Sequence, residues 1–84
     1  MRIISQDNET NVPYEVVAIG IEPSYAENYE IVAGDRLSDP DATWIVLGEY
    51  SSYDKALGIF EQIIMSGNAG RKTFRMPLNK DVPE

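Results

Sequence analysis

The sequence predicts an α+β fold in which an antiparallel sheet of about five strands carries one helix on one face, in the order ββββαβ. Segments rich in β-branched residues fill the first part of the chain, and clusters of turn-forming residues separate them. One stretch with helical spacing of apolar residues follows. A length of 84 residues corresponds to one domain, so we expect residues 1–84 to form a single unit.

The first two expected strands form an N-terminal hairpin. Residues 2–5 and residues 12–21 are rich in Ile and Val, and the polar segment 6–11 lies between them. Asn8 suits the turn because asparagine tolerates a positive φ better than most residues. Pro13 lacks an amide hydrogen, so it belongs near the start of its strand or on a sheet edge.

Two further strands are expected over residues 29–33 and 42–50, after loops at residues 22–28 and 34–41 that are dense in turn formers. The run Trp44-Ile45-Val46-Leu47 is apolar at every position. Alternate residues of a strand point to opposite faces, so this strand is expected at the centre, buried on both sides or at a subunit contact. Because one helix covers only one face, we expect a homo-oligomer.

A helix is expected to begin at Ser51 and to end at Gly67, a residue typical of helix C-termini. The sequence Ser51-Ser52-Tyr53-Asp54 matches a capping box, in which polar side chains bond the free amides of the first turn. Apolar residues then recur at helical spacing and form one stripe: Ala56, Leu57, Phe60, Ile63 and Ile64.

The last expected strand, residues 71–76, carries most of a basic cluster. Alternation directs Phe74 and Met76 toward the core, and Arg71 and Arg75 outward or into a subunit interface. Two guanidinium groups about 7 Å apart along a strand could bind a diphosphate or two carboxylates. The alternative is that they neutralise the acidic N-terminal half, within the protein or across an oligomer contact. The full cluster is Arg71, Lys72, Arg75 and Lys80.

Aromatic side chains could complete a nucleotide pocket by stacking on a base. Tyr50 and Tyr53 are the ligand-binding candidates that accompany the two arginines, and Tyr14 and Trp44 are further candidates. For Trp44, a role as a core or interface anchor is the alternative.

The composition disfavours an enzyme. The chain has no Cys and no His, which excludes disulfides and the Ser-His-Asp and Cys-His arrangements and removes the commonest metal ligand. The glycines are scattered and form no phosphate loop. The carboxylates Asp35, Asp39 and Asp41 lie in a turn-forming loop and lack EF-hand spacing. We expect a non-enzymatic protein with no catalytic residue, no metal site and no cofactor.

Charge is unevenly distributed along a chain whose net charge is −7. Residues 1–54 contain eleven acidic and two basic residues, whereas residues 55–84 contain three acidic and five basic residues. Direct nucleic-acid binding over a broad face is disfavoured, because it requires a basic surface. An acidic face could instead imitate nucleic acid in the groove of a basic partner protein, or serve only for solubility. Its candidate residues are Glu22, Glu27, Glu30, Asp35, Asp39 and Asp41.

The sequence also indicates a soluble, cytoplasmic protein. Asp7 and Glu9 interrupt any N-terminal apolar run, so no signal peptide is expected. No apolar stretch approaches the roughly 20 residues of a transmembrane helix. The absence of Cys fits the cytoplasm.

The chain contains the segments MRIISQD, VPYE, GEYSSYDKALGIFEQI and KTFRMP in this order. Together they resemble a group of small proteins from Firmicutes and their phages, which start RIISQDG…(V/F)PYE and later carry a YSSEEKA helix start and an F-x-F-P ending. The resemblance spans most of the chain. It departs at Asn8, where the group has glycine, and at Met76, where the group has a second aromatic residue.

The resemblance implies a role in phage counter-defence. Some such proteins are sponges that bind cyclic nucleotide immune signals, such as the cyclic ADP-ribose-type messenger of Thoeris defence. Our leading hypothesis is a non-enzymatic homo-oligomer that sequesters a small phosphate-bearing nucleotide in the host bacterial cytoplasm. In it, Arg71 and Arg75 bind phosphates and Tyr50 or Tyr53 stacks on the base. The alternatives are an acidic inhibitor of a basic host protein, similar to an anti-CRISPR protein, and a plain structural or interaction domain.

Overall fold

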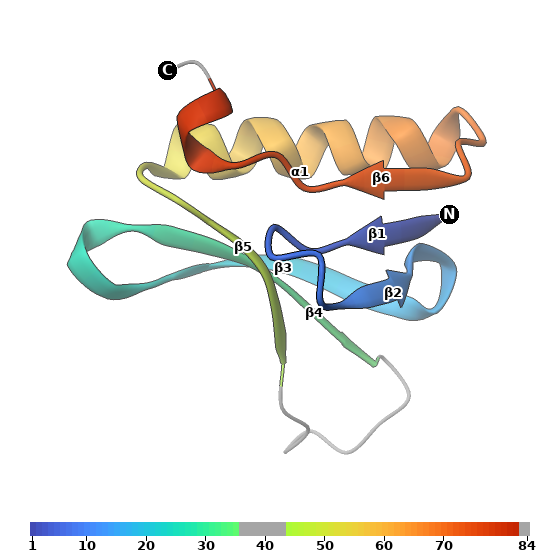
Figure 1. Ribbon diagram of the computed structural model, residues 1–84, viewed down its shortest axis with the longest axis horizontal. Helices are drawn as coiled ribbons and strands as arrows, with labels where there is room; N and C mark the ends of the chain where they lie inside the picture. The colour runs from blue at the N-terminus through green and yellow to red at the C-terminus, as the bar shows by residue number, and fades with distance from the viewer. Residues whose placement is uncertain (36–43, 83–84) are drawn as a thin grey trace.

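The computed structural model describes residues 1–35 and 44–82 and shows one α-helix with six strands in that part of the chain (Figure 1). The strands are β1 (Arg2–Ile4), β2 (Asn11–Pro13), β3 (Val17–Pro23), β4 (Tyr29–Asp35), β5 (Ile45–Tyr50) and β6 (Thr73–Arg75). The helix is α1 (Tyr53–Asn68), and three 3-10 turns are η1 (Tyr14–Val16), η2 (Tyr25–Glu27) and η3 (Asn79–Asp81). The predicted α+β class is confirmed.

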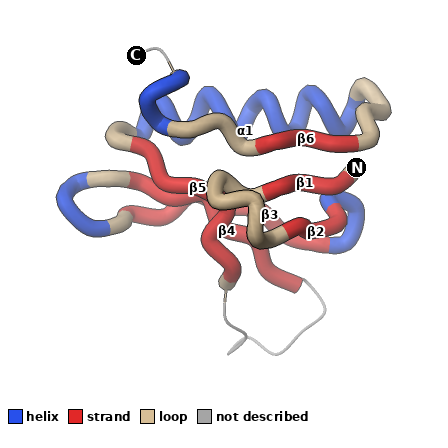
Figure 2. The backbone as a smooth tube through the Cα atoms, viewed as in Figure 1, coloured by secondary structure: helices blue, strands red, loops and turns tan. Residues whose placement is uncertain are grey.

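The strands form two sheets rather than one, as Figure 2 shows. One three-stranded sheet has the order β2-β1-β6 and the other has the order β3-β4-β5. In the first sheet β1 pairs antiparallel with β2 and parallel with β6, whereas the second is antiparallel throughout. The prediction of a single antiparallel sheet is therefore wrong. Because α1 forms a long crossover before β6, the last strand can return parallel to the first.

The strand expected over residues 12–21 is broken by η1, which leads the chain from the first sheet into the second. The amide of Tyr14 donates to the carbonyl oxygen of Met1 over 2.9 Å. The Tyr14 ring lies so close to Gly67 that a Cβ there would stand 2.5 Å from it. The break thus follows from contacts with distant parts of the chain, and the valines on both sides of the turn conceal it in the sequence.

The predicted N-terminal hairpin is confirmed, because β1 and β2 pair antiparallel across a polar turn. The Ser5 hydroxyl donates to the Asp7 carboxylate, which also accepts the amide hydrogen of Glu9 over 3.0 Å. These two bonds favour the charged form and lower the pKa of Asp7 below its ordinary value of 3.8. Asn8 has the positive φ, 62°, that its place in the turn predicted.

The strand expected at the centre of the sheet is an edge strand. β4 is central in the second sheet, and β5 lies at its margin. Leu47 is buried, but Trp44, Ile45 and Val46 are exposed. The expected strand began at residue 42, and its first two positions lie outside the described residues.

Gln6 closes the outer edge of β5. Its amide hydrogen donates to the Leu47 carbonyl oxygen over 2.8 Å, and its side-chain oxygen accepts the amide hydrogen of Glu49 over 2.8 Å. The side-chain nitrogen donates to the carbonyl oxygen of Pro77 over 2.9 Å. The same oxygen accepts the Tyr50 hydroxyl over 2.8 Å. A single side chain therefore joins both sheets and the segment that follows β6.

Helix α1 packs on the second sheet, in contact with β3, β4 and β5. Its N-cap is Ser52 rather than Ser51, and the Ser52 hydroxyl accepts the amide hydrogen of Lys55 over 3.2 Å. The helix therefore begins at Tyr53, two residues after the predicted start, and ends at Asn68, one residue after the predicted end. Asp54 lies in the first turn. Phe74 and Met76 pack inward as predicted. The core combines both sheets and the helix: Ile3, Val12, Ile31, Ala33, Leu47, Tyr50, Ala56, Ile59, Ile63 and Met76.

Candidate anion-binding groove

The chain reverses after α1, so that β6 runs back beside the helix (Figure 1). Gly70 has a φ of 75°, which glycine adopts without strain, and the Arg71 amide donates to the Ser66 carbonyl oxygen over 3.1 Å. The Arg2 amide donates to the Lys72 carbonyl oxygen over 2.9 Å and begins the parallel pairing of β6 with β1. This geometry places the basic strand next to the C-terminal half of α1.

A groove of about 490 Å³ lies between this half of the helix and β6. Arg71 and Arg75 both line it and are exposed. The amide of Gln62 and the hydroxyls of Ser66 and Thr73 offer further hydrogen-bonding groups. The remaining lining residues are Met65, Ala69 and Phe74. Guanidinium, amide and hydroxyl groups together suit an anionic ligand with oxygen acceptors.

The guanidinium of Arg75 is held in place by the turn of the first hairpin. Its Nη1 donates to Oδ1 of Asn8 over 2.7 Å. A guanidinium carries five N–H donors in a fixed fork, and the bond to Asn8 uses one of them. Holding this side chain before a ligand arrives lowers the entropy that binding costs.

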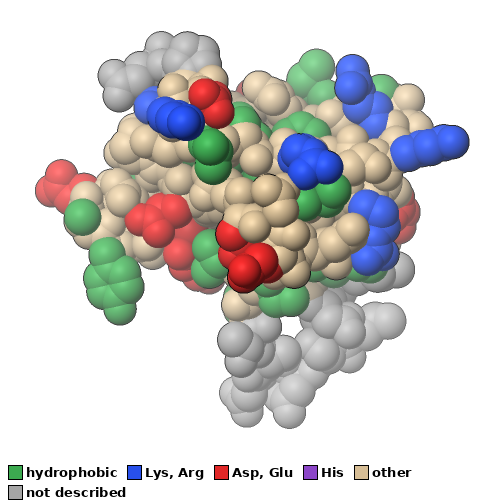
Figure 3. All heavy atoms as spheres, in the orientation of Figure 1, with side chains coloured by type: hydrophobic (Ala, Val, Ile, Leu, Met, Phe, Trp, Pro, Cys, Tyr) green, Lys and Arg blue, Asp and Glu red, His purple; other side chains and the backbone are tan. Residues whose placement is uncertain are grey.

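No described carboxylate forms an ion pair with Arg71, Lys72 or Arg75. Within residues 1–35 and 44–82, the single ion pair joins the N-terminal ammonium to Glu15. Figure 3 shows Lys and Arg side chains gathered over β1 and β6, while Asp and Glu side chains lie toward the β3–β4 hairpin and the β1–β2 turn. Among the described side chains, no ion pair thus supports the alternative that the basic strand neutralises the acidic half.

Tyr50 does not join the two arginines. Its side chain is 1% exposed, and its hydroxyl donates to the Pro77 carbonyl oxygen. Burial raises the pKa of Tyr50 to about 12, although a hydrogen bond with Gln6 opposes this. The predicted stacking role of Tyr50 does not fit this burial, because its ring has no free face for a ligand.

Tyr53 also lies away from the groove. It begins α1, whose 16 residues extend over about 24 Å, and the groove adjoins the other end. Its ring packs edge-to-face on Tyr29, with 5.5 Å between the ring centroids and 74° between the ring planes. Tyr14 and Trp44 do not line the groove either. Its apolar contacts come from Phe74 and from Met65, which is 69% exposed.

The helical wall of the groove was missed in the sequence, although a signal for it exists. Residues 62, 65, 66 and 69 recur at i, i+3, i+4 and i+7 and therefore share one flank of α1. The flank is mostly polar and resembles an ordinary solvated surface. The role of Asn8 has no sequence signal, because it depends on the return of β6 to β1.

The candidate acidic face is partly assembled. Glu22 pairs with Glu30 in the strand register, and Glu30 pairs with Glu49, so three carboxylates form a row across the second sheet. The side-chain nitrogen Nδ2 of Asn28 donates to Oε1 of Glu49 over 2.7 Å. Glu27 is exposed in the neighbouring turn η2. The Asp35 side chain and the residues Asp39 and Asp41 lie outside the described part of the structure. Glu49 was not among the acidic residues predicted from the sequence.

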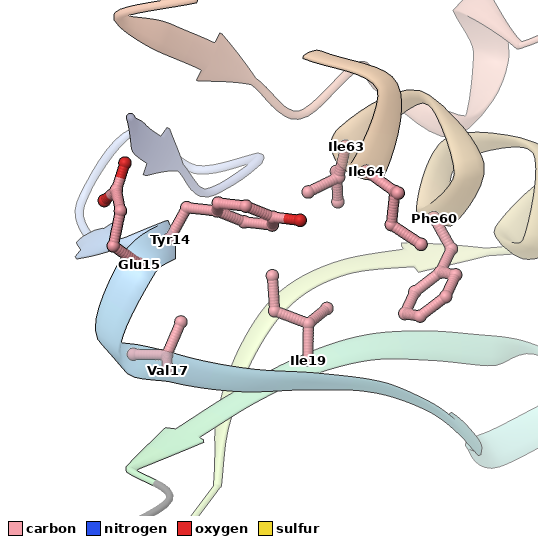
Figure 4. Close-up of a pocket in the computed structure, with 7 residues that line it drawn as sticks. All are labelled: Tyr14, Glu15, Val17, Ile19, Phe60, Ile63 and Ile64. Carbon is pink, nitrogen blue, oxygen red and sulfur yellow. The ribbon is translucent and has the colours of Figure 1, made fainter. Parts of the chain in front are cut away.

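A second groove, of about 400 Å³, lies on the other flank of α1 and is mainly apolar. Figure 4 shows the Tyr14 ring reaching toward the helix, over the side chains of β3. It is lined by Tyr14, Glu15, Val17, Ile19, Phe60, Ile63 and Ile64.

In the described residues, no group of three or more His, Cys, Asp or Glu side chains is arranged to hold a metal ion. No helix in the same residues has both the length and the apolar character needed to cross a membrane.

Comparison of the chain with protein-family models, curated proteins and solved structures found no match. The segments MRIISQD, GEYSSYDKALGIFEQI and KTFRMP, which lie far apart in the sequence, meet in the structure. Gln6, Tyr50 and Pro77 belong to these three segments and converge on the Pro77 carbonyl oxygen. Glu15, from VPYE, pairs with the N-terminal ammonium. These four residues thus hold the fold, whereas Arg75, from KTFRMP, lines the groove.

Proposed function

We propose that this chain binds a small phosphate-bearing ligand in the groove between α1 and β6 and sequesters it without converting it. The observation that carries this proposal is the convergence of Arg71 and Arg75 on one groove, with no described carboxylate paired to either. Guanidinium groups bind phosphate oxygens through two parallel hydrogen bonds, and such charge-assisted bonds are stronger than neutral ones.

A nucleotide fits the groove better than a bare phosphate. The volume of about 490 Å³ falls within the range of small-molecule sites. Met65 and Phe74 offer apolar contact for a base or a sugar, and Gln62 and Ser66 offer polar groups on the facing helix. The resemblance to phage-associated proteins supports a counter-defence role, in which the ligand is a nucleotide immune signal in the host cytoplasm.

Calorimetric titration with a defined panel tests this function. The probes are cyclic ADP-ribose, ADP-ribose, cyclic di-GMP and pyrophosphate. We expect one nucleotide to bind, and Arg71→Ala and Arg75→Ala each to weaken its affinity about tenfold or more, since a hydrogen bond to a charged group contributes about 1.5–3 kcal/mol. Lys80→Ala is the matched control, because it removes one positive charge outside the groove. At about 100 times its Kd, the ligand should add about 2.7 kcal/mol of stability.

Three results contradict the proposal. Arg71→Ala and Arg75→Ala leaving nucleotide binding intact would place the site elsewhere. An equal loss in Lys80→Ala would show attraction by overall charge rather than a defined site. Failure of the entire panel to bind at low salt would reject nucleotide sequestration.

The row formed by Glu22, Glu30 and Glu49 favours a second candidate function, inhibition of a basic nucleic-acid-binding protein. Like charges directly opposite each other in a sheet destabilise it, and a basic partner protein would offset this repulsion on binding. A purified Cas9–guide RNA complex is a suitable probe. Its binding should weaken steeply with salt and with the Glu22→Gln/Glu30→Gln double variant. An affinity that is unchanged between low and high salt would exclude this candidate.

A further inference from the structure

The edge of β3 is open, whereas the other strand edges of the described structure are protected. β2 is three residues long and ends in Pro13, and β6 is three residues long and carries Arg75. The edge of β5 is closed by Gln6. β3 runs for seven residues, and although it ends in Glu22 and Pro23, its five positions 17–21 contain neither a charge nor a proline. Long uncharged edges are templates for pairing with another strand, and native proteins normally blunt them.

Hydrogen bonding identifies the groups that β3 presents at this edge. The Ser24 amide donates to the Asn28 carbonyl oxygen over 2.8 Å, so this pair and every second pair along the ladder are the hydrogen-bonded ones. Ala18, Gly20 and Glu22 therefore direct their backbone groups toward β4. Ile19 and Ile21 direct theirs outward, and no other described segment forms a backbone hydrogen bond with them.

We propose that a second copy of this chain pairs antiparallel with β3, across a two-fold axis near Ile19 or Gly20, and joins the two β3-β4-β5 sheets into one. The same pairing covers the apolar groove beside β3, where Phe60 and Ile64 extend from the helix. A two-fold interface uses the same patch on both subunits, so the outward backbone groups of each β3 form hydrogen bonds with those of the other.

Charge at the edge permits this contact between two acidic chains. Positions 17–21 are uncharged, and the Glu15 carboxylate at the mouth of the groove is paired with the N-terminal ammonium. With the axis at Gly20, Glu22 faces Ala18 of the partner subunit rather than an equivalent glutamate. Each chain has a net charge of −7, but pairing at this edge brings no two carboxylates into direct contact.

Tyr25 supplies an independent argument for a second copy. Its side chain is 90% exposed just beyond the end of β3. It lies in η2, where Ala26 and Glu27 have φ values of 56° and 64°, a left-handed conformation that costs energy in residues other than glycine. Tyr25 follows the end of β3 and Tyr14 precedes its start, so the proposed antiparallel pairing brings the Tyr25 end of one copy toward the Tyr14 end of the other, where Tyr14 lines the apolar groove. A single two-fold axis would therefore bring the open edge of β3, the apolar groove and the Tyr25 ring of both copies into one interface.

This interface leaves the candidate anion site accessible. Successive helix residues are about 100° apart around the axis, so positions 60 and 64 lie on the flank opposite to positions 62, 65 and 69. Dimerisation is thus independent of the proposed ligand, and each can fail without the other.

Sedimentation velocity over a wide range of protein concentration tests the dimer. We expect twice the chain mass of 9.4 kDa for the natural sequence and for Met65→Lys, but one chain mass for Ile64→Lys. The two variants gain the same charge at adjacent positions on opposite flanks of α1. Ile64 is already 38% exposed, so the substitution leaves the core intact, and circular dichroism verifies this. Tyr25→Ala touches no core residue and should weaken the dimer.

Amide hydrogen exchange then locates the interface. The Ile19 and Ile21 amides should be protected in the dimer and exchange rapidly in monomeric Ile64→Lys, while the Gly20 amide stays protected in both. A chain that is monomeric at every concentration would overturn the proposal. So would a dimer that persists in Ile64→Lys, or one in which the Ile19 and Ile21 amides exchange freely, because another surface would then hold it together.

Discussion

The side-chain amide of Gln6 donates to the carbonyl oxygen of Pro77 over 2.9 Å, although the two residues stand 71 positions apart in the chain. The same side chain accepts the amide hydrogen of Glu49 at the edge of β5. An amide side chain can take the place of a peptide group because it offers both a donor and an acceptor. Gln6 thus completes the β5 edge as a neighbouring strand would.

Gln6→Ala should therefore lower the free energy of unfolding by about 2 kcal/mol, because the Glu49 amide and the Pro77 carbonyl lose a partner. Urea unfolding measures the change. Gln62→Ala, at an exposed helix position, is the control and should change stability by less than about 0.5 kcal/mol. Equal effects of the two substitutions would show that the bridge adds no stability.

The two helix glycines should respond in opposite directions to alanine. A Cβ at Gly58 meets nothing within 4 Å, so Gly58→Ala should stabilise the protein by up to about 1 kcal/mol through helix propensity. A Cβ at Gly67 would stand 2.5 Å from the Tyr14 ring, so Gly67→Ala should destabilise despite the same propensity. Thermal unfolding of both variants tests this. A gain in melting temperature for Gly67→Ala would show that Tyr14 moves away at little cost.

Stability should fall in alkali through Tyr50. The folded pKa of Tyr50 is raised to about 12 from an ordinary 10.0, because burial disfavours the phenolate. The associated stability is complete below pH about 10 and is lost as the pH rises toward about 12, where the unfolded chain ionises first. Urea unfolding across this range should show a smaller pH slope for Tyr50→Phe than for the exposed-site control Tyr25→Phe. Identical slopes would contradict burial of the phenol.

Acid should weaken the first hairpin through Asp7. The pKa of Asp7 lies below its ordinary value of 3.8, because the Ser5 hydroxyl and the Glu9 amide bond its carboxylate. The stability that these two bonds contribute is therefore complete at a pH above the ordinary pKa of Asp7. It is lost as the pH falls through the lower pKa of the folded protein. Asp7→Asn should reduce the acid slope of unfolding more than Glu9→Gln does. No difference between these two variants would indicate that the turn bonds do not persist in solution.

Local chemistry predicts much of this fold. The helix, the first hairpin and the inward direction of Phe74 and Met76 follow from periodicity and turn residues. The division into two sheets does not, because it depends on Tyr14 meeting Gly67 and on β6 returning beside β1. Such long-range contacts leave no periodic signal in a single chain.

In the candidate site, too, the sequence predicts what depends on local patterns and not what depends on long-range contacts. Alternation along a strand over residues 71–76 predicts that Arg71 and Arg75 share a face. The structure places both on one groove, although β6 covers only Thr73–Arg75 and Arg71 precedes it. An aromatic residue looks alike in sequence whether it stacks on a ligand or fills the core. Tyr50 fills the core because Gln6 and Pro77 come to it from distant positions.

The parallel pairing of β1 with β6 fixes an order of events during synthesis. β3, β4 and β5 are joined by sequential antiparallel pairing and can associate while the remainder is still being translated. β1 must wait for residues 73–75, so the first hairpin stays without its third strand until that segment has left the ribosome. The groove beside β6 therefore forms after the second sheet, and a nascent chain that has not yet released residues 73–75 cannot capture a ligand there.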